Sequence, residues 1–136
     1  MTDTLFQSYR AELEEELRAM VGDSDLPLYH MIRYHLGWSD ETGNPRGPMT
    51  GKALRPLLCL LACEAVGGPW RRALPAAASL EILHNFSLVH DDIDYRGQDR
   101  RGSPAVWRVW GEPQAINAGD ALLALPLTLS RRCHHP

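Results

Sequence analysis

The sequence has 136 residues, 44% hydrophobic and 23% charged, which is typical of a folded globular domain and argues against extensive disorder. A net charge of −3 and a pI near 6.0 exclude a general attraction to nucleic acid or to an acidic membrane surface. The three cysteines form an odd number without a CxxC pair, so neither a disulfide framework nor a zinc knuckle is implied.

The first element is a predicted surface helix over residues 4–21. Its apolar residues recur at helical spacing, opposite the acids of ELEEEL, and are Leu5, Tyr9, Leu13, Leu17 and Met20. This stretch has no cationic start followed by an apolar core, so it is not predicted to be a signal peptide. No apolar run approaches the roughly 18 residues of a membrane span, so we expect no membrane span and a cytoplasmic location.

A short second helix is predicted from Leu26 to Leu36, opening at Asp25 with Pro27 in its first turn. Residues 37–51 are rich in glycine and proline and are therefore predicted to form a loop. A long loop directly ahead of a charged motif is often functional.

The third predicted helix starts near Lys52, runs to about Val66 and closes at two glycines. Its apolar stripe is predicted to comprise Leu54, Leu57, Leu58, Leu61 and Ala65. Lys52, the only lysine beside 13 arginines, and Arg55 are three residues apart and share one face at the helix start. Free backbone N–H groups at that end favour anions.

The fourth predicted helix covers residues 74–92, with Pro75 in its first turn. Two apolar faces follow from a rotation of about 100° per residue: Ile82, Phe86, Val89 and Ile93 on one side, and Leu80, His84, Leu88 and Asp91 on the other. A helix that is apolar on two sides is expected inside a bundle. The C-terminal end of this helix is then expected to place its aspartates outside the core.

A fifth helix is predicted from Pro113 to Leu125, with Pro126 stopping it. The residues from about 130 to 136 show no periodicity and are predicted to be an unstructured tail. Without repeats or strand-like alternation, residues 1–136 are predicted to form one all-α domain, an antiparallel helical bundle.

Charge is concentrated at the end of the fourth helix, where Asp91, Asp92 and Asp94 precede Arg100 and Arg101. Clustered carboxylates repel one another unless a cation shares the site. Mg²⁺ is usually held by one or two carboxylates together with phosphate oxygens of a substrate, and arginines bind phosphate oxygens in a bidentate manner. The pattern therefore predicts a metal-bridged phosphate site.

His84 can join this site because it precedes Asp91 by seven residues, two helical turns or about 10.5 Å along the same face. A ligand one diphosphate long would span the two. Taken singly, Asp91 and Asp92 are also compatible with a solvated helix end, Arg100 and Arg101 with a surface pair, and Lys52 with a solubilising residue. Their joint spacing favours the phosphate site.

Four segments resemble one known family: GKALRPLL, ILHNFSLVHDD, RRGSPAVW and INAGDALL, in that order. They look like the trans-isoprenyl diphosphate synthases, the polyprenyl synthetase family, which includes geranylgeranyl and farnesyl diphosphate synthases. The resemblance covers roughly residues 4–128 and corresponds to the N-terminal part of the isoprenoid synthase fold. It implies an all-helical homodimer that extends an allylic diphosphate by one isopentenyl unit with Mg²⁺.

The resemblance also implies roles for individual residues. Isopentenyl diphosphate would be held by Lys52, Arg55, His84 and Arg101. Magnesium would be held by Asp91 and Asp92, and the allylic diphosphate would be contacted by Arg100. The ion would draw off the allylic diphosphate, so Asp91, Asp92 and Arg100 form the expected catalytic set.

One departure from the family concerns its first aspartate motif, DDxxD. The third aspartate would fall at Tyr95, whereas this chain carries Asp94 one place earlier. Relative to Asp91, position 95 lies at about 40° and position 94 at about −60° around the helix. If Asp94 serves as a metal ligand, it leans off the metal face, so weaker magnesium binding is expected.

A second departure is the lack of a second aspartate-rich motif, which family members supply from further residues. We therefore expect only one of the two acidic halves of the magnesium site, and no turnover by the 136 residues alone. A truncation or frameshift near residue 126 is the expected cause.

Two alternatives stay open. One is a non-catalytic partner that dimerises with a full-length synthase and tunes its product length. The other is a helical metal phosphohydrolase that uses His90 and Asp91, with His84 and Asp120 as further ligands. Product length itself is left open, although Phe86 and Ser87 occupy the stretch that limits chain growth in the family, where Phe86 favours a shorter product.

Overall fold

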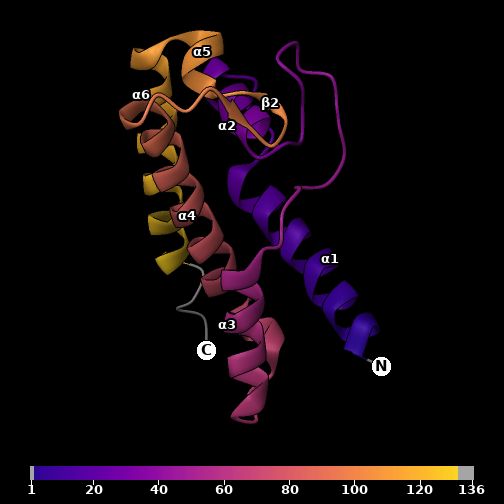
Figure 1. Ribbon diagram of the computed structural model, residues 1–136. Coiled ribbons are helices and arrows are strands. Elements are labelled where there is room, and N and C mark those ends of the chain that lie inside the picture. Colours follow the sequence, from indigo (N-terminus) through magenta and orange to yellow (C-terminus); the bar gives the residue numbers. More distant parts are fainter. Residues whose placement is uncertain (1, 132–136) are drawn as a thin grey trace.

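A computed structural model describes residues 2–131 as a helical structure with one short hairpin (Figure 1). The α-helices are α1 (Thr2–Val21), α2 (Pro27–His35), α3 (Leu54–Ala65), α4 (Leu74–Asp94), α5 (Val106–Trp110) and α6 (Glu112–Ala124). The 3₁₀ helices are η1 (Trp70–Ala73) and η2 (Leu125–Arg131). The strands are β1 (Asp99–Arg100) and β2 (Ser103–Pro104), paired antiparallel.

The predicted all-α class is confirmed, and α1, α2, α4 and α6 lie where the periodicity predicted helices. The sequence did not anticipate η1, α5 or the hairpin. The predicted stop at Pro126 corresponds to a change from α-helix to the 3₁₀ helix η2. Residues 130 and 131 of the predicted unstructured tail belong to η2, and residues 132–136 lie outside the described residues. No described helix is long and apolar enough to cross a membrane.

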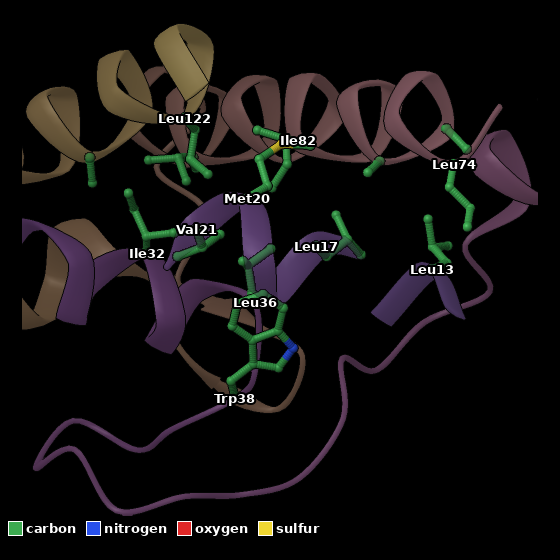
Figure 2. Close-up of a cluster of buried hydrophobic side chains, with 14 of the residues drawn as sticks. Leu13, Leu17, Met20, Val21, Ile32, Leu36, Trp38, Leu74, Ile82 and Leu122 are labelled. Atoms are coloured by element: carbon green, nitrogen blue, oxygen red, sulfur yellow. The ribbon is translucent and has the colours of Figure 1, made fainter. Parts of the chain in front are cut away.

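The core is built from one face of α1 against α2, α4 and α6 (Figure 2). Tyr9, Leu13 and Leu17, spaced four residues apart, are at most 2% exposed, which confirms the predicted apolar face of α1. The same core contains Ile32 from α2, Ile82 from α4 and Leu122 from α6. The helix α1 ends where Gly22 adopts a positive φ of 76° and donates its N–H to the Arg18 carbonyl.

The longest helix, α4, contacts α1, α3 and α6 and so lies at the centre of the arrangement (Figure 1). One of its two predicted faces is packed, since Ile82 and Val89 are buried and Phe86 packs against the core. The other is not buried in the described residues: Leu80 is 41% exposed and Asp91 is exposed. The prediction of a helix buried on both sides is therefore wrong for this part of the chain.

The start of α3 also differs from the prediction. Ala53 adopts a left-handed conformation, with φ 48° and ψ 38°, so α3 begins at Leu54 and Lys52 lies in the loop before it. Of the predicted apolar stripe only Leu57 is buried, whereas Leu54 and Leu58 are 60% and 54% exposed. Helical spacing identified this stripe, but the described elements cover only Leu57 and part of Leu61 and leave Leu54 and Leu58 exposed.

The helices α4 and α6 approach closely at Gly119. A Cβ atom at this position would lie 2.3 Å from His90 Nε2, which is closer than any real contact. Replacing Gly119 with alanine is expected to lower the free energy of unfolding by about 1 kcal/mol, because displacing the His90 ring from its packing against Phe86 costs more than the roughly 1 kcal/mol that alanine gains in helix propensity. Urea denaturation would measure the loss.

A matched variant separates this clash from a general helix effect. His90→Ala in the Gly119→Ala background removes the obstructing ring, so the second substitution should restore part of the lost stability. Additive losses at the two positions would contradict the close packing.

Candidate functional site

Four predicted residues, each from a different element of the structure, converge on one pocket. Lys52 comes from the loop before α3, Arg55 from the first turn of α3 and His84 from the middle of α4, and the turn between β1 and β2 contributes Arg101. Together they line a cavity of about 200 Å³, which we call the basic pocket. Its remaining lining residues are Thr50, Gly51, Ala53, Leu54 and Glu81.

Contacts with α1 hold the loop that carries Lys52. Arg10 donates one terminal N–H to the Lys52 carbonyl at 2.7 Å and another to the Gly51 carbonyl at 3.2 Å. The left-handed Ala53 then turns the chain into α3. This loop geometry places Lys52 and Arg55 at one pocket even though they do not share a helix.

The guanidinium of Arg101 is the most constrained cation of the basic pocket. It donates to the Thr50 carbonyl at 3.3 Å, to the His35 carbonyl at 2.5 Å and to Asn85 Oδ1 at 2.9 Å. Burial lowers the pKa of Arg101 from its usual value, and the nearby carboxylate of Glu81 opposes this shift. Within the described residues Arg101 forms no ion pair.

His84 is half-buried in the wall of the basic pocket. Burial lowers its pKa, and the positive charges of Arg55 and Arg101 lower it further, against the opposing effect of Glu81. The imidazole is therefore neutral near pH 7 and can contribute one N–H donor and one acceptor. An anion in the pocket would offset the two arginine charges and favour the protonated form.

The three aspartates after His90 do not form one ligand group. Asp92 is buried and accepts two hydrogen bonds from Arg100, at 2.6 and 3.1 Å, whereas Asp91 and Asp94 are exposed. The described residues contain no cluster of three or more His, Cys, Asp or Glu side chains able to hold a metal. Asp92 thus finds its cation in Arg100, which explains how this carboxylate tolerates burial.

Arg100 and Arg101 face different surroundings although they are adjacent. Arg100 lies in β1 and pairs with Asp92, so its guanidinium is already engaged by a carboxylate. Arg101 occupies the turn, where its φ of 53° and the φ of 74° at Gly102 match the two positive values of a type I′ hairpin turn. The turn separates the two side chains and sends only Arg101 to the basic pocket.

A magnesium ion fits this arrangement only in part. The carboxylates of Asp91 and Asp94 have no hydrogen bond or ion pair to any described residue, and one or two free carboxylates with substrate phosphate oxygens are a common magnesium site. Asp92 is not free, because Arg100 occupies both of its oxygens. Tyr95, where the third family aspartate would fall, is 82% exposed and follows the last helical residue.

The residues proposed for a metal phosphohydrolase lie partly together. His90 Nε2 is 3.6 Å from Asp120 Oδ1, which brings α4 and α6 into polar contact. His84, however, lines the basic pocket with Arg55 and Arg101, and the described part of the chain offers no three-ligand group. This geometry does not support a metal-bound hydrolase site.

Three polar residues behind the basic pocket were not predicted from the sequence. Glu81 and Asn85 lie one turn apart on α4, and His35 lies on α2; all three are at most 5% exposed. The available signal was the spacing of Glu81 and Asn85 at i and i+4, next to the apolar residues Ile82 and Val89. The contact between His35 and Asn85, 50 residues apart, could not be read from spacing.

The stretch associated with product length is half-buried. Phe86 packs against the core, with its ring 5.0 Å from the ring of His90, and the Ser87 hydroxyl donates to the His84 carbonyl at 2.6 Å. Ser87 is thereby turned back onto its own helix. An influence of either residue on chain length stays a prediction.

Comparison with known proteins gives consistent matches. Residues 47–136 match the family model described as Polyprenyl synthetase. The chain is 46% identical over 120 residues to a (2E,6E)-farnesyl diphosphate synthase of Mycobacterium tuberculosis, covering 88% of this chain and 33% of the relative. Over 72 residues it is 57% identical to a geranylgeranyl diphosphate synthase of Methanosarcina mazei, covering 53% of this chain and 22% of the relative.

Solved structures give the same fold. The crystal structure of a polyprenyl synthetase from Streptomyces coelicolor A3(2) superposes with a TM-score of 0.84 at 39% identity, covering 93% of this chain and 38% of the other. A geranylgeranyl pyrophosphate synthetase from Pyrococcus horikoshii gives 0.79 at 35% identity, covering 99% and 39%. The chain spans about a third of the length of the curated relatives it matches over 120 residues.

Proposed function

Since the chain belongs to the polyprenyl synthetase family, we propose that its basic pocket binds isopentenyl diphosphate for a prenyltransferase that extends an allylic diphosphate. One observation carries the proposal: Lys52, Arg55, His84 and Arg101 line a single cavity of about 200 Å³. Guanidinium groups bind phosphate oxygens through paired hydrogen bonds, and an ammonium group adds a point charge. The pocket thus has the donors that a diphosphate needs.

The other half of the reaction is assigned to the end of α4. Asp91, which is exposed and unpaired in the described residues, would hold Mg²⁺ with phosphate oxygens of the allylic substrate, and Asp94 would assist. When bound, the ion would neutralise the charge of the departing diphosphate. Arg100 would contact the allylic diphosphate, with Asp92 fixing its guanidinium from behind.

We further propose that the 136 residues bind substrate but do not turn it over alone. The relatives are about three times longer, so turnover would use segments outside the matched region, in the same chain or in a partner synthase paired with it as a dimer. A role as a partner subunit stays open, since the chain is also 42% identical over 106 residues to the Arabidopsis protein named heterodimeric geranylgeranyl pyrophosphate synthase large subunit 1.

Calorimetric titration of isopentenyl diphosphate into the 136-residue chain tests the pocket. Arg55→Gln is expected to weaken binding about tenfold, because one charged hydrogen-bonding partner is lost from the edge of the pocket. The matched control is Arg72→Gln, since Arg72 is also an exposed arginine but lies on η1 and is not part of the pocket lining. Equal affinities of the natural chain and the Arg55 variant, or equal losses in both variants, would rule out the assignment.

Magnesium binding gives a separate test of the acidic end. Tyr95→Asp restores an aspartate one helical turn from Asp91 and is expected to strengthen Mg²⁺ binding by about 1 to 3 kcal/mol in the presence of a diphosphate analogue. Tyr95→Asn is the control, since it has the same size without the charge. Unchanged magnesium affinity in the aspartate variant would show that position 95 does not face the ion.

A further inference from the structure

A chain of buried polar groups runs from α4 to α2 behind the basic pocket. Asn85 is fully buried, His35 is 4% exposed and Glu81 is 5% exposed. Buried polar groups lower stability unless they are hydrogen-bonded, so such a cluster needs a partner for each member. The hydrogen bonds of these three residues connect them to Arg101, either directly or through Asn85.

The hydrogen bonds of Asn85 fix the orientation of its carboxamide. Its Nδ2 donates to the Glu81 carbonyl at 2.8 Å and to Glu81 Oε1 at 3.2 Å. Its Oδ1 lies 2.9 Å from Arg101 Nη2 and 3.0 Å from His35 Nε2. Because a guanidinium only donates and the two Glu81 oxygens only accept, the reversed amide would lose these contacts.

His35 must therefore be the second donor to Asn85 Oδ1, with its proton on Nε2. Burial, followed by the positive charge of Arg101, lowers the pKa of His35 to about 3, so the ring stays neutral. The carbonyl of the same residue accepts a hydrogen bond from Arg101 Nη1 at 2.5 Å. His35 thus contacts Arg101 directly through its backbone and indirectly through Asn85.

These contacts leave Arg101 both fixed and charged. Three of its five N–H groups are used by neutral acceptors, and one N–H on each terminal nitrogen has no partner in the described residues. Its backbone lies in a left-handed conformation, with φ 53°, that non-glycine residues seldom adopt. Arg100 differs, because the carboxylate of Asp92 compensates its charge.

We propose that His35 and Asn85 are positioning residues, which hold the guanidinium of Arg101 with two N–H groups turned to a diphosphate in the basic pocket. The neutral imidazole orients the carboxamide, Glu81 holds it from the other side, and the carboxamide orients the guanidinium. The ligand named here rests on the proposed function, whereas the hold on Arg101 does not.

The test compares His35→Phe, which removes the donor, with His35→Gln, which replaces it by an amide N–H. Two quantities are measured: the ¹⁵N–¹H NMR signal of Arg101 Nε and the affinity for inorganic pyrophosphate. His35→Phe should broaden the Arg101 signal and weaken pyrophosphate binding about tenfold. His35→Gln should keep the sharp signal and the affinity of the natural chain. His30→Phe is the control on the same helix, since His30 bonds to the Asp40 carbonyl away from the pocket and should leave both unchanged.

If His35 had a purely structural role, His35→Gln would not selectively restore the NMR signal of Arg101. An unchanged Arg101 signal and unchanged affinity in folded His35→Phe would overturn the proposal. If the natural chain does not bind pyrophosphate although the Arg101 signals follow the expected pattern, the positioning is supported and the proposed ligand is wrong. Should His35→Phe fail to fold, ¹⁵N NMR of the natural chain decides: a neutral His35 protonated on Nε2 from pH 5 to 8 supports the proposal, and a charged ring or the other tautomer overturns it.

Discussion

Replacing Asp92 with alanine is expected to lower the free energy of unfolding by about 3 kcal/mol, whereas the same change at Asp94 should alter it by less than about 0.5 kcal/mol. The Asp92 side chain is 7% exposed and receives both hydrogen bonds of the Arg100 fork, so its removal leaves a partly buried cation without a partner. Asp94 is exposed and has no such partner in the described residues. Urea denaturation at one pH measures both values.

The double variant Asp92→Ala/Arg100→Met provides the control. It removes the unpaired charge together with the carboxylate, so its loss of stability should be smaller than that of Asp92→Ala alone. Similar losses at Asp92 and Asp94 would contradict the structural role of the pair.

The second large effect concerns ligand affinity. Arg101→Met is expected to weaken isopentenyl diphosphate binding by about 100-fold, or about 3 kcal/mol, because a fixed guanidinium with two free N–H groups is lost from the pocket. Arg101→Lys keeps the charge but not the planar guanidinium, so its affinity for isopentenyl diphosphate should lie between those of Arg101→Met and the natural chain. Calorimetric titration measures the affinities, and circular dichroism verifies that each variant is folded.

The adjacent arginine is the matched control for that effect. Arg100→Met should change isopentenyl diphosphate affinity less than about threefold, because Arg100 faces Asp92 and does not line the basic pocket. Comparable losses at positions 100 and 101 would indicate that the net charge of the hairpin, and no specific contact, attracts the ligand.

Helical periodicity predicted much of this fold correctly. The spacing of Tyr9, Leu13 and Leu17 gave the buried face of α1, and Pro27 marked the first turn of α2. The grouping of His84 with Lys52 was also anticipated, from the motifs and not from helical geometry. Periodicity works here because each helix turns one stripe to a shared core.

The sequence could not reveal contacts that depend on tertiary geometry. The pairing of Asp92 with Arg100 requires the chain to reverse through a left-handed Arg96, and the separation of Arg100 from Arg101 requires a type I′ turn without the usual Asn-Gly signal. The buried partner of Asn85 lies on another helix. For α3, spacing identified apolar residues correctly but gave no information on whether another element covers them.

The most direct measurement is a crystal structure of the chain with isopentenyl diphosphate bound. The expected result is diphosphate density in the basic pocket, within hydrogen-bonding distance of Lys52, Arg55, His84 and Arg101, while the Asp92–Arg100 pair stays intact. Diphosphate bound elsewhere, with these four side chains turned to solvent or to one another, would contradict the assignment of the pocket.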